Sequence, residues 1–166
     1  MRVLIATGLY PPEIGGPATY SKILEEELPK RDIGVEILSF GEVRHLPKIV
    51  RHFVYFLKCL RRSAKADLIF AQDPVSVGLP SVLAAKILRK KFILKIVGDY
   101  AWEQWQIKNE KLKNKNHKLK FKSLEEFQSE KFDFLTELRR KIQKFVAKRA
   151  DKIIVPSEYL KKIVSE

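Results

Sequence analysis

The chain has 166 residues, of which 45% are hydrophobic, and its 33 lysines and arginines outnumber the 20 acidic residues, which gives a formal net charge of +13. A chain of this length and apolar content can bury a substantial core, which excludes disorder along its whole length. Cys59 is the only cysteine, which excludes an intrachain disulfide and a multi-cysteine metal site.

Short apolar runs rich in β-branched residues alternate with segments of helical periodicity, and the first run is apolar on both faces, as in a buried parallel strand. The predicted strands are Arg2–Thr7, Val35–Phe40, Asp67–Ala71, Lys91–Val97 and Asp151–Val155. The predicted helices are one between Gly16 and Pro29, then Leu46–Lys65, Val75–Leu88, Leu124–Lys148 and a last helix that follows Ser157. A polar insert is expected before Leu124, and Ser123 with Glu126 forms a capping box there.

Strands separated by helices imply βαβ units, parallel pairing and right-handed crossovers. The predicted fold is α/β: a Rossmann-like, doubly wound, mainly parallel sheet in a single domain that spans residues 1–166. In such sheets ligands bind at the carboxyl ends of the strands.

The amino-terminal apolar run ends at Ala6, which is shorter than the core of about 7 to 15 residues in a signal peptide. Charged residues interrupt every other apolar stretch before it reaches the about 18 residues that span a bilayer. We therefore expect a cytoplasmic protein whose membrane role, if it has one, is peripheral and on the inner face.

Paired glycines, Gly15 and Gly16, stand between the first predicted strand and its helix. Glycines let backbone N–H groups approach a ligand, and the helix end adds free donors and a positive dipole, so an anion is expected here. The pattern is neither a GxGxxG fingerprint nor a P-loop. The alternative is a tight connection in which the glycines serve only the backbone geometry.

The motif Pro11-Pro12-x-x-Gly15-Gly16-Pro17-Ala18-x-Tyr20 resembles the amino-terminal domain of the family 4 glycosyltransferases, which have the GT-B fold. Residues 95–103 resemble the fourth-strand exit of that family, and residues 150–160 resemble its closing strand and helix. The resemblance therefore covers the whole chain, residues 1–166, as the acceptor-side Rossmann-like domain.

The resemblance implies a hexosyl-transfer enzyme that moves a sugar, with retention, from a nucleotide-sugar co-substrate to a glycan or lipid-linked acceptor. It also implies that the carboxy-terminal nucleotide-sugar domain lies outside this chain, so that the chain alone is inactive and needs that domain in cis or a partner subunit in trans. No cofactor and no metal is expected. The resemblance places Gly15 and Gly16 against the diphosphate or sugar of the donor.

Asp99 follows the fourth predicted strand, where many members of this family have a histidine near the reacting sugar. A carboxylate there could hydrogen-bond a sugar hydroxyl or stabilise positive charge on the anomeric carbon, which makes Asp99 the candidate catalytic residue. The alternative is that Asp99 caps a loop or pairs with a nearby lysine.

Other residues at the same edge of the sheet are candidates for substrate binding. Aromatic faces such as that of Trp102 suit stacking on a sugar, although packing beneath the loop is the alternative. Asp73 before a proline also suits an ordinary turn, and Ser157 also suits a helix cap. The candidates are Tyr10, Glu13, Thr19, Gln72, Asp73, Trp102, Glu103 and Ser157.

Two segments carry most of the positive charge. Residues 44–62 contain six lysines and arginines and no acid, interleaved with aromatic and aliphatic residues, which is typical of an amphipathic helix at an anionic membrane surface. The residues expected to contact the membrane are Arg51, Lys58, Arg61 and Arg62; the alternative is a helix packed on the sheet with a solvated basic face. Residues 108–122 show no helical stripe and are expected to form a mobile surface loop.

Two functions without catalysis compete with the transferase: a peripheral membrane module and a nucleic-acid-binding module. The basic balance alone favours nucleic acid. Because no recognition-helix, RNP-like or zinc-finger pattern accompanies the charge, no nucleic-acid partner is expected. His45, His52 and His117 lack the spacing of metal ligands.

Overall fold

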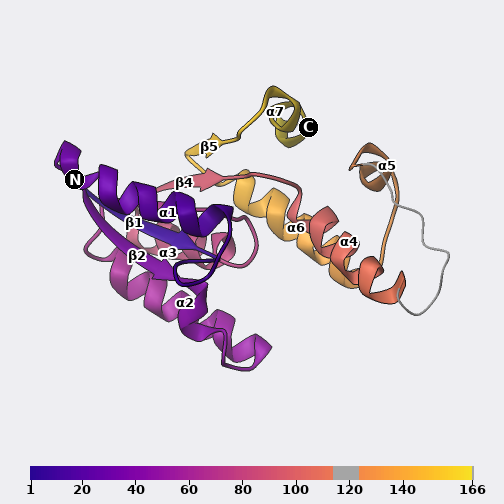
Figure 1. Ribbon diagram of the computed structural model, residues 1–166, viewed down its shortest axis with the longest axis horizontal. Helices are drawn as coiled ribbons and strands as arrows, with labels where there is room; N and C mark the ends of the chain where they lie inside the picture. The colour runs from indigo at the N-terminus through magenta and orange to yellow at the C-terminus, as the bar shows by residue number, and fades with distance from the viewer. Residues whose placement is uncertain (114–123, 166) are drawn as a thin grey trace.

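The computed structural model describes residues 1–113 and 124–165 (Figure 1). Five strands form one parallel sheet in the order β2-β1-β3-β4-β5. The strands are β1 (Arg2–Thr7), β2 (Gly34–Ser39), β3 (Leu68–Ala71), β4 (Lys91–Lys95) and β5 (Lys152–Ile154). The helices are α1 (Gly16–Glu27), α2 (Lys48–Ser63), α3 (Gly78–Leu88), α4 (Tyr100–Lys113), α5 (Leu124–Ser129), α6 (Phe134–Ala147) and α7 (Glu158–Ser165), with short 3-10 turns η1 (Pro29–Arg31) and η2 (Phe40–Val43). The predicted α/β fold class is confirmed.

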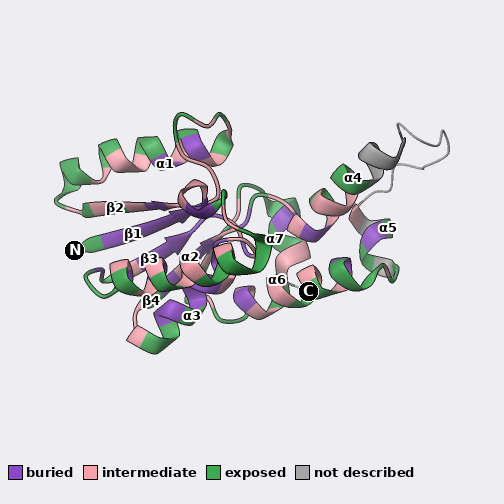
Figure 2. Ribbon diagram, turned by 90° about the horizontal axis from the view of Figure 1, so that it is seen from below, coloured by how far each residue is buried: buried purple, intermediate pink, exposed green. Residues whose placement is uncertain are grey.

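The apolar runs of the sequence become the centre of the sheet because each strand face is covered by helices. On one face α1 packs Tyr20 and Leu24 onto Val3, Ile5 and Phe70. On the other face the larger core lies under α2, α3 and α6 and includes residues from β1, β3 and β4 (Figure 2). Burial on both faces explains why five consecutive residues of β1 are buried.

Two predictions for the second half of the chain are wrong. Tyr100–Lys113 is a helix, α4, where an insert and the start of a loop were expected, and α4 packs against α6. The predicted helix over Leu124–Lys148 is interrupted between α5 and α6. Asp133 begins α6, where its side chain accepts a hydrogen bond from the Thr136 hydroxyl at 2.8 Å, and Phe132 stacks on Phe127.

Two further expectations fall partly or wholly on residues 114–123. The capping box at Ser123 and the part of the expected surface loop after Lys113 lie outside the described residues. Within residues 1–113 and 124–165, no helix combines the length and the apolar character needed to cross a membrane.

Candidate functional site

The carboxyl ends of β1, β3 and β4 bring the glycine loop, residues 72–73 and residues 98–103 to one edge of the sheet. Two observations show how closely these segments approach each other. A Cβ atom added to Gly8 would lie 3.5 Å from Asp73 Oδ2, and the hydroxyl groups of Ser76 and Tyr100 are hydrogen-bonded at 2.9 Å. The segments predicted to carry function therefore meet in space.

Charged contacts hold the loop between β1 and α1 in place. Arg44 forms an ion pair with Glu13 and also donates from Nη2 to the Gly8 carbonyl oxygen at 2.9 Å. The Tyr10 hydroxyl donates to Glu25 at 2.5 Å, a bond that lowers the pKa of Glu25 together with the larger effect of Lys22. Tyr10 and Glu13 thus shape the loop through contacts with the protein itself.

The amino end of α1 is open to a ligand. A Cβ atom on Gly15 would lie 2.9 Å from Leu9 Cδ1, so the end of the Leu9 side chain would have to move, whereas Gly16 faces open space. Among the described residues, no side chain caps this helix end, and Thr19 donates from both N and Oγ1 to the Gly15 carbonyl oxygen. The first backbone N–H groups of α1 are therefore available to an anion.

A groove of about 520 Å³ lies beside this helix end. It is lined by Gly16, Pro17, Thr19, Tyr20, Ile23, Gln72, Lys95 and Val97. The ammonium group of Lys95 sits 3.1 Å from the centroid of the Tyr20 ring, and partial burial lowers the pKa of Lys95 below its ordinary value. The groove therefore contains a cation whose charge is incompletely solvated.

Gln72 supplies a free acceptor in the same groove. The residue is only 3% exposed, its Nε2 donates to Ser21 Oγ at 2.8 Å, and its Oε1 has no hydrogen-bond partner within the described part of the chain. The Ser21 hydroxyl itself donates to the Pro17 carbonyl oxygen at 2.8 Å, so Ser21 Oγ must accept from the Gln72 amide. This orientation fixes Oε1 as the unsatisfied atom, and a buried unsatisfied acceptor favours a ligand that donates.

Two carboxylates near the centre of the edge have raised pKa values. Burial raises the pKa of Asp73 to about 6, although its Oδ1 accepts backbone hydrogen bonds from Val75 and Ser76 at 2.8 and 2.6 Å. Partial desolvation, and then the nearby charges of Asp99 and Asp73, raise the pKa of Glu103. Perturbed carboxylates at a strand edge are typical of functional sites.

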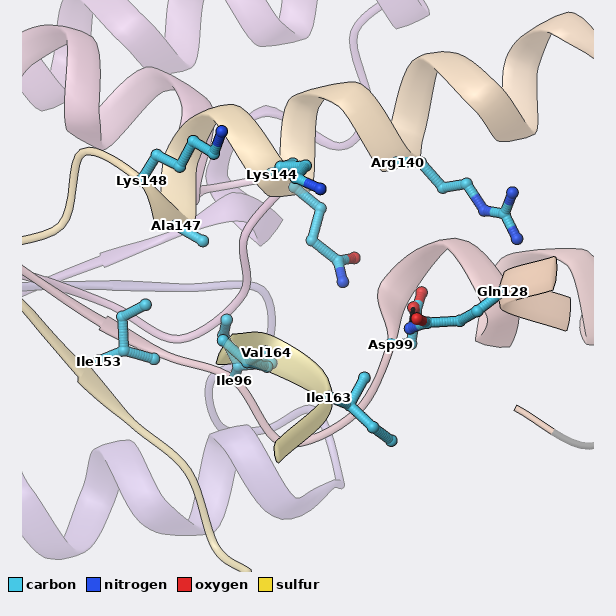
Figure 3. A pocket seen from close by; sticks show the side chains of 11 residues that line it. Ile96, Asp99, Gln128, Arg140, Lys144, Ala147, Lys148, Ile153, Ile163 and Val164 are labelled. Atoms are coloured by element: carbon cyan, nitrogen blue, oxygen red, sulfur yellow. Dashed lines mark hydrogen bonds between the residues drawn. The ribbon is translucent and has the colours of Figure 1, made fainter. Parts of the chain in front are cut away.

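Asp99 is 6% exposed and serves as a helix cap: its Oδ1 accepts from the Trp102 backbone N–H at 3.0 Å, at the start of α4. Its Oδ2 accepts a hydrogen bond from Gln128 Nε2 at 3.5 Å, and both residues line a cavity of about 460 Å³ (Figure 3). One oxygen of Asp99 is therefore a helix cap, as in the cap alternative, and the other accepts a long hydrogen bond from Gln128 at the edge of the cavity.

The cavity beside Asp99 has one cationic and one aliphatic side (Figure 3). Arg140 and Lys144 come from one face of α6 and Lys148 directly follows its last residue. Arg140 is also paired with Glu137 at 3.0 Å, so the two lysines supply most of the charge. Ile153 and Val164 line the cavity from β5 and α7. This lining suits a ligand that has both an anionic group and an apolar part.

The remaining predicted residues mainly have structural contacts. Ser157 Oγ accepts from the Leu160 backbone N–H at 3.2 Å and so caps α7, and Trp102 is half-buried on α4. The neighbouring Trp105 packs against the rings of Phe127 and Phe132, which is the packing alternative.

Three of the four basic residues expected at a membrane are engaged within the protein. Lys58 and Arg62 pair with Glu42 at 2.8 and 2.9 Å, and the Arg51 guanidinium lies 5.6 Å from the centroid of the Phe40 ring. Arg61 alone among the four is exposed. Arg51, Lys58 and Arg62 lie on the side of α2 that faces β2 and η2, and the sequence could not show this.

Lys95 and the basic residues of α6 were not among the residues predicted for the site. Lys95 stands inside an apolar run, Phe92–Val97, and a lysine in a strand that is predicted to be central could have indicated a groove beside it. Arg140, Lys144 and Lys148 carried no such indication, because their common target depends on where α7 packs.

No family model and no curated protein matches the chain. The solved structures that resemble it include a protein from Listeria monocytogenes, provisionally assigned as UDP-N-acetylglucosamine 2-epimerase, with a TM-score of 0.59 and 11% identity. They also include the UDP-GlcNAc 2-epimerase of Methanocaldococcus jannaschii, with a TM-score of 0.56 and 15% identity. Each match covers 99% of this chain but only 41% and 42% of the respective protein, so the chain spans about two fifths of their length. At these identities the likeness shows the fold alone: the chain has the fold of one Rossmann-like half of a GT-B protein.

Proposed function

We propose that the chain is the acceptor-binding half of a glycosyltransferase, which moves a sugar with retention from a nucleotide-sugar donor to a glycan or lipid-linked acceptor. It acts with a second Rossmann-like domain, supplied in cis or by a partner subunit. The observation that carries the proposal is the groove at α1, where Lys95, the open helix end and the free Oε1 of Gln72 face one space.

The groove is suited to the phosphate-sugar junction of a donor. A diphosphate oxygen would accept from the first N–H groups of α1 and attract Lys95 away from the Tyr20 ring. A sugar hydroxyl would donate to Gln72 Oε1 and satisfy a buried acceptor that has no partner among the described residues. A phosphate alone would leave Gln72 unsatisfied, so the pair of groups favours a phosphorylated sugar over a free anion.

Asp99 is proposed as the catalytic residue on the acceptor side. Asp99 lines the cavity in Figure 3, where its Oδ2, in exchange for Gln128, would accept a hydrogen bond from a sugar hydroxyl or stabilise positive charge at the anomeric carbon. The cationic and aliphatic lining of this cavity supports an acceptor with a phosphate and a lipid part.

The test is a titration of the isotope-labelled chain with UDP-N-acetylglucosamine, followed by NMR of the backbone amides. We expect weak binding, with a Kd of about 1 mM because only half of the site is present, and shifts at Gly15, Gly16 and Ala18. Lys95→Met should remove these shifts. Lys91→Met is the matched control, because Lys91 is an exposed lysine at the opposite end of the same strand.

Inorganic pyrophosphate provides the second probe. The sugar-nucleotide should lose more affinity than pyrophosphate in Gln72→Leu, because only the sugar donates to Oε1. Equal behaviour of Lys95→Met and Lys91→Met would contradict the proposal. The two similar structures are named for epimerisation. If the chain, once the second domain is supplied, converts the sugar of the nucleotide-sugar without any acceptor, epimerisation and not transfer is its activity.

A further inference from the structure

The outer face of α2 carries apolar side chains that the fold does not use. Ile49 is 87% and Phe53 61% exposed, and Val50 and Leu57 are also exposed. Residues 49, 53 and 57 are four apart and therefore form one stripe along the helix. The core takes Tyr55, Cys59 and Ser63 from another side of the same helix. The stripe is thus available to something outside the chain.

A second helix extends this face. α3 packs beside α2 (Figure 2). Its Leu83 and Ile87, again four residues apart, are exposed as well. We call the exposed side chains of α2 and α3 together the outer apolar face: Ile49, Val50, Phe53, Leu57, Leu83 and Ile87. Soluble monomers rarely expose apolar patches of this kind without an interaction partner.

The charge around the outer apolar face has one sign. Residues 44–66 and 74–98, which include all of α2 and α3, contain no aspartate or glutamate. The exposed cations on and beside these helices are Lys48, Arg61, Lys65, Lys86 and Arg89. Lys58 and Arg62 are already paired with Glu42 and do not contribute.

We infer that the outer apolar face binds an anionic lipid bilayer, with Phe53 and its neighbours at the acyl boundary and the exposed cations at the headgroups. Interfacial helices combine an apolar stripe with lysine and arginine in this way, and each cation near an anionic leaflet adds about 1 kcal/mol. A protein partner would instead favour a rim of mixed charge and few lysines. A second copy of the chain would bring two cationic faces together.

The direction of α2 and α3 relates the outer apolar face to the candidate site. α2 and α3 follow β2 and β3, so their amino ends lie at the carboxyl edge of the sheet, where the candidate site also lies. Contact through Ile49 and Val50 would hold that edge near the membrane. The inference itself does not depend on the proposed function, because lipid binding requires no sugar-nucleotide.

The experiment is flotation of the 166-residue chain with phosphatidylcholine vesicles that contain about one third phosphatidylglycerol, compared with pure phosphatidylcholine. We expect binding to the anionic vesicles only. Phe53→Ser should lower the partition coefficient at least about tenfold, since it removes a large apolar side chain from the acyl boundary. Phe134→Ser is the matched control, because Phe134 is 78% exposed on a different helix, and its binding should equal that of the wild type.

A second pair of variants distinguishes binding through the outer apolar face from adsorption that depends only on net charge. Arg61→Gln with Lys86→Gln should reduce binding about thirtyfold, whereas Lys22→Gln with Lys30→Gln, which remove the same charge from the α1 side, should leave it nearly unchanged. All these side chains are exposed, so unchanged thermal unfolding is the check that each variant folds.

Three results would overturn the inference. The first is absence of binding to anionic vesicles at low salt. The second is equal loss from the two charge variants, which indicates adsorption by net charge. The third is a wild-type dimer in sedimentation that Phe53→Ser dissociates, which would assign the face to self-association.

Discussion

The carboxyl group of Asp73 is expected to make folding pH-dependent in a direction opposite to that of most aspartates. Its pKa is raised by burial from 3.8 to about 6, so the charged form is disfavoured in the folded state. A raised pKa means that its favourable contribution is complete below pH 3.8 and is lost as the pH rises through about 6. Asp73→Asn keeps an oxygen for the N–H groups of Val75 and Ser76 but removes the charge.

The magnitude follows from the shift. About two pKa units at 1.36 kcal/mol each give about 3 kcal/mol, fully expressed above about pH 7 and roughly half expressed at pH 5. The free energy of unfolding of Asp73→Asn minus that of the wild type should therefore rise by about 2 to 3 kcal/mol between pH 4 and pH 7.5. Any constant cost of the new amide N–H group cancels from this pH dependence.

The assay is urea unfolding followed by circular dichroism across that pH range. Asp133→Asn is the matched control, because the hydrogen bond from Thr136 lowers the pKa of the exposed Asp133. A lowered pKa stabilises the fold above pH 3.8, so the Asp133→Asn difference should change with pH in the opposite direction. A flat difference for Asp73→Asn would refute the assignment of Asp73 as a desolvated carboxylate.

Three further predictions concern the site and the core. Asp99→Asn should retain the folded state, since asparagine also caps helices, and should reduce transfer at least about a hundredfold once the second domain is supplied; wild-type turnover would remove Asp99 from the mechanism. Pyrophosphate affinity should fall as the pH rises through the lowered pKa of Lys95, below 10.5, and calorimetry should show no such fall in Lys95→Met. Tyr55→Phe, which leaves the Leu38 carbonyl oxygen without the hydroxyl bonded to it at 3.0 Å, should cost about 1 to 2 kcal/mol in urea unfolding.

The sheet could be predicted because its sequence pattern is local. β1 reads as an uninterrupted apolar run, and Pro29 ends the first helical stretch, so the βαβ alternation follows from neighbouring residues alone. α4 could not be predicted in this way. Its stability depends on packing against α6, which brings Trp105 to the rings of Phe127 and Phe132 from distant parts of the sequence.

The candidate site shows the same division. Gly15, Gly16 and Gln72 could be assigned to one edge of the sheet from the strand exits, and the structure lines one groove with Gly16 and Gln72. Lys95 could not be assigned to the groove from the sequence, because its role depends on the place of β4 in the sheet and on the position of the Tyr20 ring beside it. The basic residues of α2 were assigned to a membrane because a helical periodicity cannot show that Glu42 lies beside Lys58 and Arg62.

The most direct test of the groove at α1 is a crystal structure of the chain grown with a UDP-sugar at saturating concentration. The proposed function predicts phosphate density at the first N–H groups of α1, with Lys95 moved from the Tyr20 ring onto it and a sugar hydroxyl within hydrogen-bond distance of Gln72 Oε1. A UDP-sugar bound elsewhere, with Gln72 Oε1 still unpaired and Lys95 still on the ring, would contradict it.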